Sequence, residues 1–314
     1  MNKKVARKRE VGIERLNDLG KQIWAEQMNE GKIVKDIFKV FKSKERLVRH
    51  SDENISIICA VDKGTISKHG TYIETMVYYI CKELSNVSFL DSCSAWGLQT
   101  KHKDVISIPI SLYLKIEEIK LLLMEKKLSM TKEEDINTIF KEIYTCAVSD
   151  EVQADEDIRE WTQDLDLGFI GNDGKVYLYE VKKTGDFGAD VALKHFMHYF
   201  YAYANYVYHN EPAFDKIVCN FLLVERKEDE AYKHMIHGPF GFVTFKEFCD
   251  RHNIIITEDE TFNLFYYLTQ VNDKEFVDTI ERVRNMLIDN SKLNELTPAM
   301  FLKEYRKVYP TRDV

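Results

Sequence analysis

Apolar residues along the chain form two kinds of pattern: some recur with the period of a helix, and others form short continuous runs that are typical of buried strands. In residues 71–84 and 191–208, apolar side chains recur every three or four positions, which predicts two amphipathic helices. Residues 87–90 and 216–225 are short apolar runs, which predict buried strands. The middle of the chain is therefore predicted to combine helices with strands.

A hairpin that carries ionisable groups is predicted for residues 164–183, DLDLGFIGNDGKVYLYEVKK. Apolar residues alternate with polar or small ones in 164–170, as in a strand with one buried face. Residues 176–181 are rich in β-branched and aromatic side chains, which suit a second strand, and turn formers occupy 171–174. The two arms carry four ionisable groups, Asp164, Asp166, Glu180 and Lys182.

The length of the hairpin loop decides which of these groups face one another. A two-residue loop would place Asp166 and Glu180 on opposite faces of the hairpin. A three-residue loop at 172–174, with glycine in the left-handed position, pairs Asp166 with Glu180 and Asp164 with Lys182. A five-residue loop gives the same pairing, so we predict an odd-numbered loop with all four groups on one face.

Two carboxylates that face each other in this way repel, because their Cβ atoms lie roughly 5 Å apart. A divalent cation removes the repulsion. Oxygen ligands suit Mg²⁺, which keeps several waters and takes phosphate oxygens as further ligands, and Mn²⁺ can substitute for it. Lys182 lies on the same face and can hold or deprotonate a water beside the metal, so the pattern favours metal-assisted hydrolysis of a phosphodiester.

The motif resembles that of the PD-(D/E)xK nuclease superfamily, which includes most type II restriction endonucleases. Asp166 is followed, after thirteen intervening residues, by Glu180-Val181-Lys182, and the local match covers residues 161–183. No proline precedes either aspartate, which departs from the family pattern. The resemblance implies that Asp166, Glu180 and Lys182 are catalytic, and that Asp166, Glu180 and the Val181 carbonyl bind Mg²⁺.

Two further carboxylates are candidates for accessory roles at this site. Glu74 lies in the predicted helix 71–84, at about the place where members of the family often carry a glutamate close to the metal. Asp164 is the alternative to Asp166 as the metal ligand.

The resemblance also implies a fold and an activity. The family core runs helix, three strands, helix, strand, so we expect an α/β fold with a mixed central sheet flanked by helices, a restriction-endonuclease-like αβββαβ core, with helical additions. The expected activity is that of a type II site-specific deoxyribonuclease, which cuts double-stranded DNA in a Mg²⁺-dependent reaction and leaves 5′-phosphate and 3′-hydroxyl ends. Expected partners are duplex DNA, a second copy in a homodimer, and a cognate DNA methyltransferase encoded nearby.

Two other functions stay open. One is another nuclease of the same superfamily, acting in repair, on junctions or at transposon ends, and the other is a non-catalytic DNA-binding protein of the same fold. RecB-type nucleases carry Gln-x-x-x-Tyr in the helix after the motif, where this chain has His195-x-x-x-Tyr199. No third zinc ligand with typical spacing stands near His195-x-x-His198, so we expect these histidines to face solvent or DNA.

The chain is expected to have three segments within one compact unit. Residues 1–60 form an N-terminal helical, basic segment, residues 61–250 the nuclease core with an insertion at about 100–160, and residues 251–314 a mostly helical C-terminal extension. The insertion is predicted to hold one strand and two helices, at 104–113, 115–127 and 132–144.

Charge is distributed unevenly along the chain. The formal net charge is −8, but residues 1–49 hold 14 Lys+Arg and 7 Asp+Glu, a balance of +7 that leaves −15 for the remainder. A basic arm of this kind can follow the phosphates of DNA and add salt-dependent affinity, and the alternative is a terminus that only aids solubility. The candidate DNA-binding residues of the arm are Lys3, Lys4, Arg7, Lys8 and Arg9.

The spacing of the cysteines and the hydropathy of the chain predict the cellular compartment of the protein. The six cysteines are scattered without a CxxC pair, which is typical of buried thiols in a reducing compartment. No signal peptide and no apolar run long enough to cross a membrane is apparent. We therefore expect a cytoplasmic protein with no membrane partner.

Overall fold

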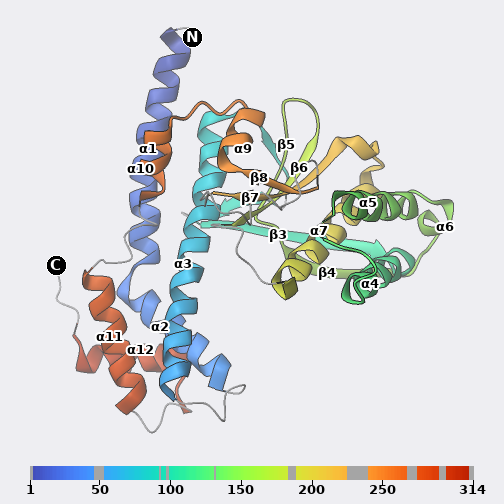
Figure 1. Ribbon diagram of the computed structural model, residues 1–314. Coiled ribbons are helices and arrows are strands. Elements are labelled where there is room, and N and C mark those ends of the chain that lie inside the picture. Colours follow the sequence, from blue (N-terminus) through green and yellow to red (C-terminus); the bar gives the residue numbers. More distant parts are fainter. Residues whose placement is uncertain are drawn as a thin grey trace. The chain divides into compact units, whose positions relative to one another are not determined.

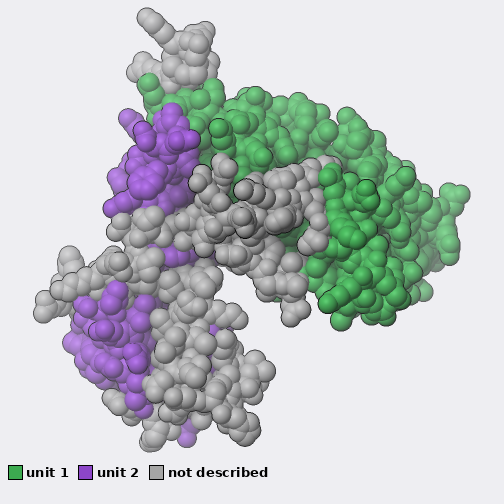
Figure 2. All heavy atoms as spheres, in the orientation of Figure 1, with its two compact units in different colours: residues 1–12, 73–256 green, residues 13–72, 257–314 purple. Residues whose placement is uncertain are grey.

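The structure is a computed structural model, and it divides into two compact units, coloured separately in Figure 2. The described residues are 3–45, 53–91, 93–96, 99–130, 132–182, 189–224, 240–266, 274–289 and 295–310. Unit 1 comprises Met1–Gly12 and Ile73–Ile256, and unit 2 comprises Ile13–Tyr72 and Thr257–Val314. Segments from the two ends of the sequence therefore share unit 2.

Unit 1 is built on a mixed five-stranded sheet (Figure 1). In spatial order its strands are β1 (Ser88–Phe89), β5 (Leu167–Ile170), β6 (Val176–Lys182), β7 (Ile217–Leu223) and β8 (Phe242–Thr244). The β1–β5 and β5–β6 pairs are antiparallel, whereas β7 and β8 continue parallel to β6. The parallel step from β6 to β7 requires a crossover, which contains α7 (Ala189–Asn210). The expected α/β class, a mixed sheet flanked by helices, is confirmed.

Alternation along β6 divides its side chains between two apolar cores. Val176 and Leu178 belong to the large buried cluster that also contains the apolar side chains of α7. Tyr179 points to the other side of the sheet, where its ring centroid lies 5.0 Å from that of Phe248 in α9 (Phe245–Arg251). All seven residues of β7 are buried, as its continuous apolar sequence predicts.

The helix predicted at 71–84 is the C-terminal part of α3 (Glu53–Leu84), and the helix predicted at 191–208 lies within α7. The side chains of Ile73, Met76 and Val77 are fully buried. A one-turn 3₁₀ helix, η1 (Phe214–Lys216), leads into β7.

The predicted insertion forms a second, three-stranded antiparallel sheet with helices attached. Its strands are β2 (Cys93–Trp96), β3 (Gln99–Pro109) and β4 (Ile158–Asp164), and the helices between β3 and β4 are α4 (Ile110–Met124), α5 (Glu133–Ala147) and α6 (Asp150–Gln153). The strand predicted at 104–113 is wrong at its end, because it stops at Pro109, which has no N–H to donate, and Ile110 begins α4. The Phe140 ring of α5 packs 5.3 Å from Phe200 and 5.0 Å from Tyr203 of α7, so the insertion shares the main core.

The hairpin loop has three residues, which confirms the prediction of an odd-numbered loop. The Gly171 N–H donates to the Lys175 carbonyl at 2.9 Å, and the Gly174 N–H donates to the Gly171 carbonyl at 3.0 Å. Gly174 has a φ of +74°, the left-handed conformation that glycine adopts at low cost. Leu167 lies opposite Tyr179 in the resulting register, so the residues next to them, Asp166 and Glu180, face each other as predicted.

The predicted pairing of Asp164 with Lys182 is wrong. Asp164 is the last residue of β4, and its Cα partner is Lys103 of β3, in the second sheet. The chain leaves that sheet at Leu165, which is buried, and bends at Asp166 before β5 begins. A single strand was predicted for residues 164–170, whereas the structure has two strands, β4 and β5, with Leu165 and Asp166 between them.

The basic N-terminal segment is helical where it is described, as part of α1 (Lys3–Gln27). Lys8 is exposed, and the Arg9 Nε donates to the carbonyl of Ile255 at 2.8 Å. The side chains of Lys3, Lys4 and Arg7 lie outside the described part of the structure.

Unit 2 is helical in its described residues. Besides parts of α1 and α3, it contains α2 (Glu30–Glu45), α10 (Glu258–Leu264), α11 (Lys274–Asp289) and α12 (Pro298–Val308). Its core joins α2, α11 and α12, with the rings of Phe38 and Phe301 stacked at 4.2 Å. The Tyr305 hydroxyl donates to Glu30 at 2.7 Å and ties the last helix to α2.

None of the helices in the described residues is long and apolar enough to cross a membrane. The five cysteines whose side chains the structure describes, Cys81, Cys93, Cys146, Cys219 and Cys249, carry free thiols, and four of them are buried.

The positive φ of Gly174 predicts the effect of a substitution there. Among the described residues no atom lies within 4 Å of the position that a Cβ would take, so Gly174→Ala meets no steric clash and should cost only the backbone strain, about 1 kcal/mol. Gly174→Asn should cost less, because asparagine tolerates the left-handed region. Urea unfolding measures both, with Asn172→Ala as the control. Equal stability of Gly174→Ala and wild type would contradict the assigned loop conformation.

Candidate functional site

The candidate site lies where the β5–β6 hairpin meets the bend after β4. Glu180 and Lys182 are two residues apart on β6, so they project from the same face of the strand. The Val181 N–H donates to the Asp166 Oδ2 at 2.8 Å, which holds the Asp166 carboxylate against β6. Three residues of the predicted motif are thus brought together by the hairpin register and this one hydrogen bond.

Lys182 lies between the two carboxylates. Its Nζ is 2.6 Å from the Glu180 Oε1 and 3.4 Å from the Asp166 Oδ2. All three side chains are largely removed from solvent, and the Glu180 carboxylate is the most buried of them. The arrangement is therefore a partly desolvated pair of acids around one cation.

His195 and Tyr199 of α7 also contact Glu180, which the sequence interpretation missed. The His195 Nδ1 lies 2.7 Å from the Glu180 Oε1, and the Tyr199 hydroxyl accepts the Glu180 backbone N–H and donates to the carbonyl of Asn220. The signal was the His195-x-x-x-Tyr199 spacing, since residues four apart lie on one face of a helix. The prediction that His195 faces solvent or DNA is wrong for its Nδ1 atom, which faces the Glu180 carboxylate.

The two candidate accessory acids have different positions. Glu74 of α3 interacts electrostatically with Asp166, Glu180 and Lys182, so the structure brings it to the cluster. Asp164 is exposed at the end of β4, and the hydrogen bond from Val181 goes to Asp166. Asp166, and not Asp164, is therefore the aspartate that lies beside β6 and Lys182.

Burial and crowding disfavour the charged forms of two of the acids. Burial, with the charges of Glu74 and Glu180, raises the pKa of Asp166 well above its ordinary value, although Lys182 opposes this. Burial also raises the pKa of Glu74 to about 7. The charge of Lys182 opposes this shift, and the charges of Glu180 and Asp164 add to it. The folded chain thus holds more carboxylates in this space than Lys182 alone neutralises.

Glu180 and Lys182 are instead held in their charged forms. Burial would raise the pKa of Glu180, but the hydrogen bond from His195 and the charge of Lys182 outweigh it, and the net shift is downward. Burial would lower the pKa of Lys182, but the charges of Asp166 and Glu180 outweigh it, and the net shift is upward. The two carboxylates therefore hold Lys182 in its charged form, which disfavours a role as a base.

The donor chemistry of the cluster fits a hard divalent cation. Asp166 and Glu180 offer carboxylate oxygens, and Mg²⁺ is commonly held by one or two carboxylates with waters and phosphate oxygens as its other ligands. In the described part of the chain, no group of three or more His, Cys, Asp and Glu side chains is placed so that it could hold a metal ion. A site made by the carboxylates of Asp166 and Glu180 would leave its other ligand positions to water and substrate.

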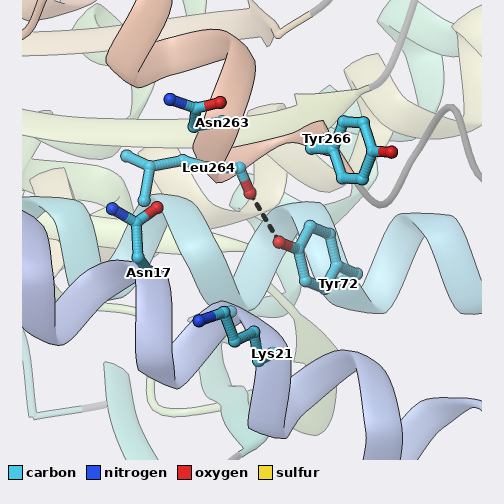
Figure 3. Close-up of a pocket in the computed structure, with 7 residues that line it drawn as sticks. Asn17, Lys21, Tyr72, Asn263, Leu264 and Tyr266 are labelled. Carbon is cyan, nitrogen blue, oxygen red and sulfur yellow. Dashed lines mark hydrogen bonds between the residues drawn. The ribbon is translucent and has the colours of Figure 1, made fainter.

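Unit 2 contains a separate pocket with a volume of about 310 Å³ (Figure 3). It lies among α1, α3 and the end of α10, and the Tyr72 hydroxyl in its wall donates to the Leu264 carbonyl at 2.5 Å. Its lining residues are Asn17, Gly20, Lys21, Tyr72, Asn263, Leu264 and Tyr266. None of these seven is acidic, so the pocket offers hydrogen-bonding groups and one ammonium but no carboxylate for a metal.

The raised pKa of Glu74 predicts a pH-dependent effect on stability. Because this carboxyl holds its proton more tightly in the folded chain, its contribution to stability is complete below about pH 4.5 and is lost as the pH rises to about 7. Glu74→Gln stays neutral, so at pH 8 it should increase the free energy of unfolding by on the order of 3 kcal/mol, and the gain should shrink towards acid pH. Urea unfolding in EDTA at several pH values measures this, with the exposed Glu160→Gln as the control. A gain that does not change with pH would contradict the assignment.

Comparisons with known proteins find no family model, no curated protein and no solved structure that matches this chain.

Proposed function

We propose that unit 1 is a Mg²⁺-dependent endonuclease that hydrolyses phosphodiester bonds of double-stranded DNA at specific sequences, in the manner of a type II restriction enzyme. The observation that carries the proposal is the convergence of Asp166, Glu180 and Lys182 beside one hairpin. The element order α3, β1, β5, β6, α7, β7 supports it, because helix, three strands, helix and strand is the core order that the resemblance to PD-(D/E)xK nucleases implies. A cytoplasmic location and a cognate DNA methyltransferase encoded nearby belong to the same proposal.

Each residue of the cluster has a role in the proposed reaction. Asp166, Glu180 and the Val181 carbonyl would hold Mg²⁺, which when bound supplies a Lewis acid to the scissile phosphate and a water. Lys182 stays charged and stabilises the negative charge that builds on the phosphate oxygens. The water oxygen forms its bond to phosphorus as the bond to the 3′ oxygen breaks. The water gives its proton to solvent and the 3′ oxygen takes one up, which leaves 5′-phosphate and 3′-hydroxyl ends.

His195 and Tyr199 keep Glu180 in place for this role. The Tyr199 hydroxyl ties the Glu180 backbone to Asn220 on β7, and the His195 ring holds the Glu180 carboxylate. A ligand whose orientation is fixed by a second hydrogen bond holds a metal better than one that rotates freely.

A second candidate is a repair or recombination nuclease of the same superfamily. His195 and Tyr199 have the spacing of the Gln-x-x-x-Tyr pattern of RecB-type nucleases, and both contact the glutamate of the motif. The two candidates differ in substrate, since a restriction enzyme cuts unmodified duplex DNA at one short sequence.

The test of the function is incubation of the purified protein with unmethylated phage DNA in Mg²⁺ and in EDTA. Discrete bands that require Mg²⁺ are expected. A Mg²⁺-dependent smear would favour the second candidate. Uncut DNA with both Mg²⁺ and Mn²⁺, on duplex, single-stranded and junction substrates, would overturn the nuclease assignment and leave a DNA-binding protein.

Substitutions in the cluster should separate cleavage from binding. Asp166→Asn, Glu180→Gln and Lys182→Ala should each slow cleavage by about three orders of magnitude, because each removes a group placed at the reacting phosphate. DNA affinity in Ca²⁺ should persist, and Asp166→Asn should fold well because it relieves repulsion. Asp164→Asn is the matched control and should cut at the wild-type rate. Loss of cleavage in Asp164→Asn but not in Asp166→Asn would show that the wrong aspartate has been assigned.

The contact between His195 and Glu180 predicts an intermediate effect. His195→Ala should reduce cleavage by about 10- to 100-fold at limiting Mg²⁺, because Glu180 loses the group that orients it. Raised Mg²⁺ should restore part of the loss, and His195→Gln should retain more activity because it keeps a donor. The exposed neighbour substitution Lys194→Ala is the control. Wild-type cleavage by His195→Ala at every Mg²⁺ concentration would remove this role.

A further inference from the structure

The pocket of unit 2 has one wall on α1 and another at the end of α10. The α1 wall is made by Asn17, Gly20 and Lys21, which are three and four residues apart and therefore share one face of the helix. The α10 wall includes Asn263 and Tyr266. The volume of about 310 Å³ is at the low end of the range for small-molecule sites, so the pocket suits one small molecule.

Tyr72 of α3 lines the pocket between these walls and is held in place from two sides. Its hydroxyl donates to the Leu264 carbonyl at 2.5 Å, and its ring meets that of Trp24 edge to face, with the ring centroids 5.5 Å apart. The side chains of Tyr72 and Leu264 are both fully buried. This side of the pocket is therefore already packed, and a ligand would not have to order it on binding.

Lys21 is the charged group among the lining residues, none of which is acidic. Its Nζ lies 3.6 Å from the Asp18 Oδ1, and both side chains are more than half exposed. An ion pair in water of this kind is weak, so it leaves the ammonium able to bind another anion. One cation without an acid beside it in the pocket favours a ligand that carries one anionic group.

Asn17 and Asn263 bring a carboxamide to the pocket from each wall. Neither carboxamide makes a hydrogen bond to another residue in the part of the chain that the structure describes. A carboxamide presents a donor and an acceptor side by side, which matches the 6-amino group and N7 of adenine. Guanine presents two acceptors at the same edge, so it matches less well.

The pocket also has room for a flat ring. The Tyr266 side chain is 42% exposed and offers a ring face on which a base can stack. Gly20 has no side chain, so the ligand can approach the backbone of α1 there. In Figure 3 the two carboxamides lie on one side of the pocket, and the rings of Tyr72 and Tyr266 lie on the other. A base stacked on Tyr266 can therefore turn its hydrogen-bonding edge to the carboxamides.

We propose that unit 2 binds a free adenine mononucleotide in this pocket. Lys21 binds the phosphate, the carboxamides of Asn17 and Asn263 bind the edge of the base, and Tyr266 stacks on its face. The binding is non-covalent and needs no metal. It goes beyond the proposed nuclease function and does not rest on it. An adenine within a DNA strand has the same chemistry, and the experiment separates the two sources.

The experiment is equilibrium dialysis of the full chain against radiolabelled AMP in EDTA, with unlabelled competitors. Saturable binding of one AMP per chain is expected. Adenosine and ribose 5-phosphate should each compete about 10-fold more weakly or worse, because each lacks one of the recognised groups. GMP should compete about 5- to 150-fold more weakly, because its edge does not match a carboxamide.

Substitutions should separate recognition of the base from recognition of the phosphate. Asn17→Leu/Asn263→Leu should abolish the preference for AMP over GMP. Lys21→Ala should weaken AMP about 10-fold and leave adenosine unchanged, and Lys21→Arg should retain most of the affinity for AMP. The matched control is Lys303→Ala, which removes an exposed lysine of α12 in unit 2 and should bind as wild type. Circular dichroism checks that each variant is folded.

Three results would each overturn the proposal: no binding at about 1 mM AMP, equal competition by AMP and ribose 5-phosphate, or wild-type binding of AMP by Lys21→Ala. Tighter binding of a deoxyadenosine oligonucleotide than of AMP would overturn the free nucleotide as the occupant. None of these outcomes depends on cleavage, so a failed nucleotide site and a failed nuclease assignment remain distinguishable.

Discussion

The three-residue loop of the β5–β6 hairpin is the constraint on which the candidate site depends. Side chains alternate along a strand, so a loop longer or shorter by one residue would turn either Asp166 or Glu180 to the opposite face. Gly174 permits the loop because its φ is +74°. Once the register is set, the Val181 N–H fixes the Asp166 carboxylate beside Glu180 and Lys182. Backbone geometry therefore determines which side chains of the cluster face one another.

The cluster is assembled at an electrostatic cost. The pKa of Asp166 and that of Glu74 are both raised, which means that the fold disfavours the ionised acids it brings together. Lys182 and His195 offset the cost at Glu180, whose pKa is lowered. Local destabilisation of this kind is typical of functional sites. Here a bound divalent cation would neutralise the carboxylates that repel one another in its absence. The buried α7 and α5 aromatics supply the packing that holds such a site together.

Much of unit 1 could be predicted from sequence, because helical spacing, apolar runs and turn chemistry are local. This is why the helices at 71–84 and 191–208, the strand at 216–225 and the Asp166–Glu180 register were found. The failures involve partners that are distant in sequence. Asp164 pairs with β3 of the insertion, and His195 reaches Glu180 only once α7 packs on the sheet. The grouping of both ends of the sequence in unit 2 likewise depends on tertiary packing, which the apolar pattern alone does not specify.

The central claim is that Asp166 and Glu180 form a divalent-cation site. Titration of Mn²⁺ into the purified protein at pH 8, with free Mn²⁺ followed by electron paramagnetic resonance, tests it without any assumption about substrate. The account predicts saturable binding to wild type that Asp166→Asn and Glu180→Gln each abolish and that Asp164→Asn leaves unchanged. Equal Mn²⁺ binding by wild type and Asp166→Asn would contradict it.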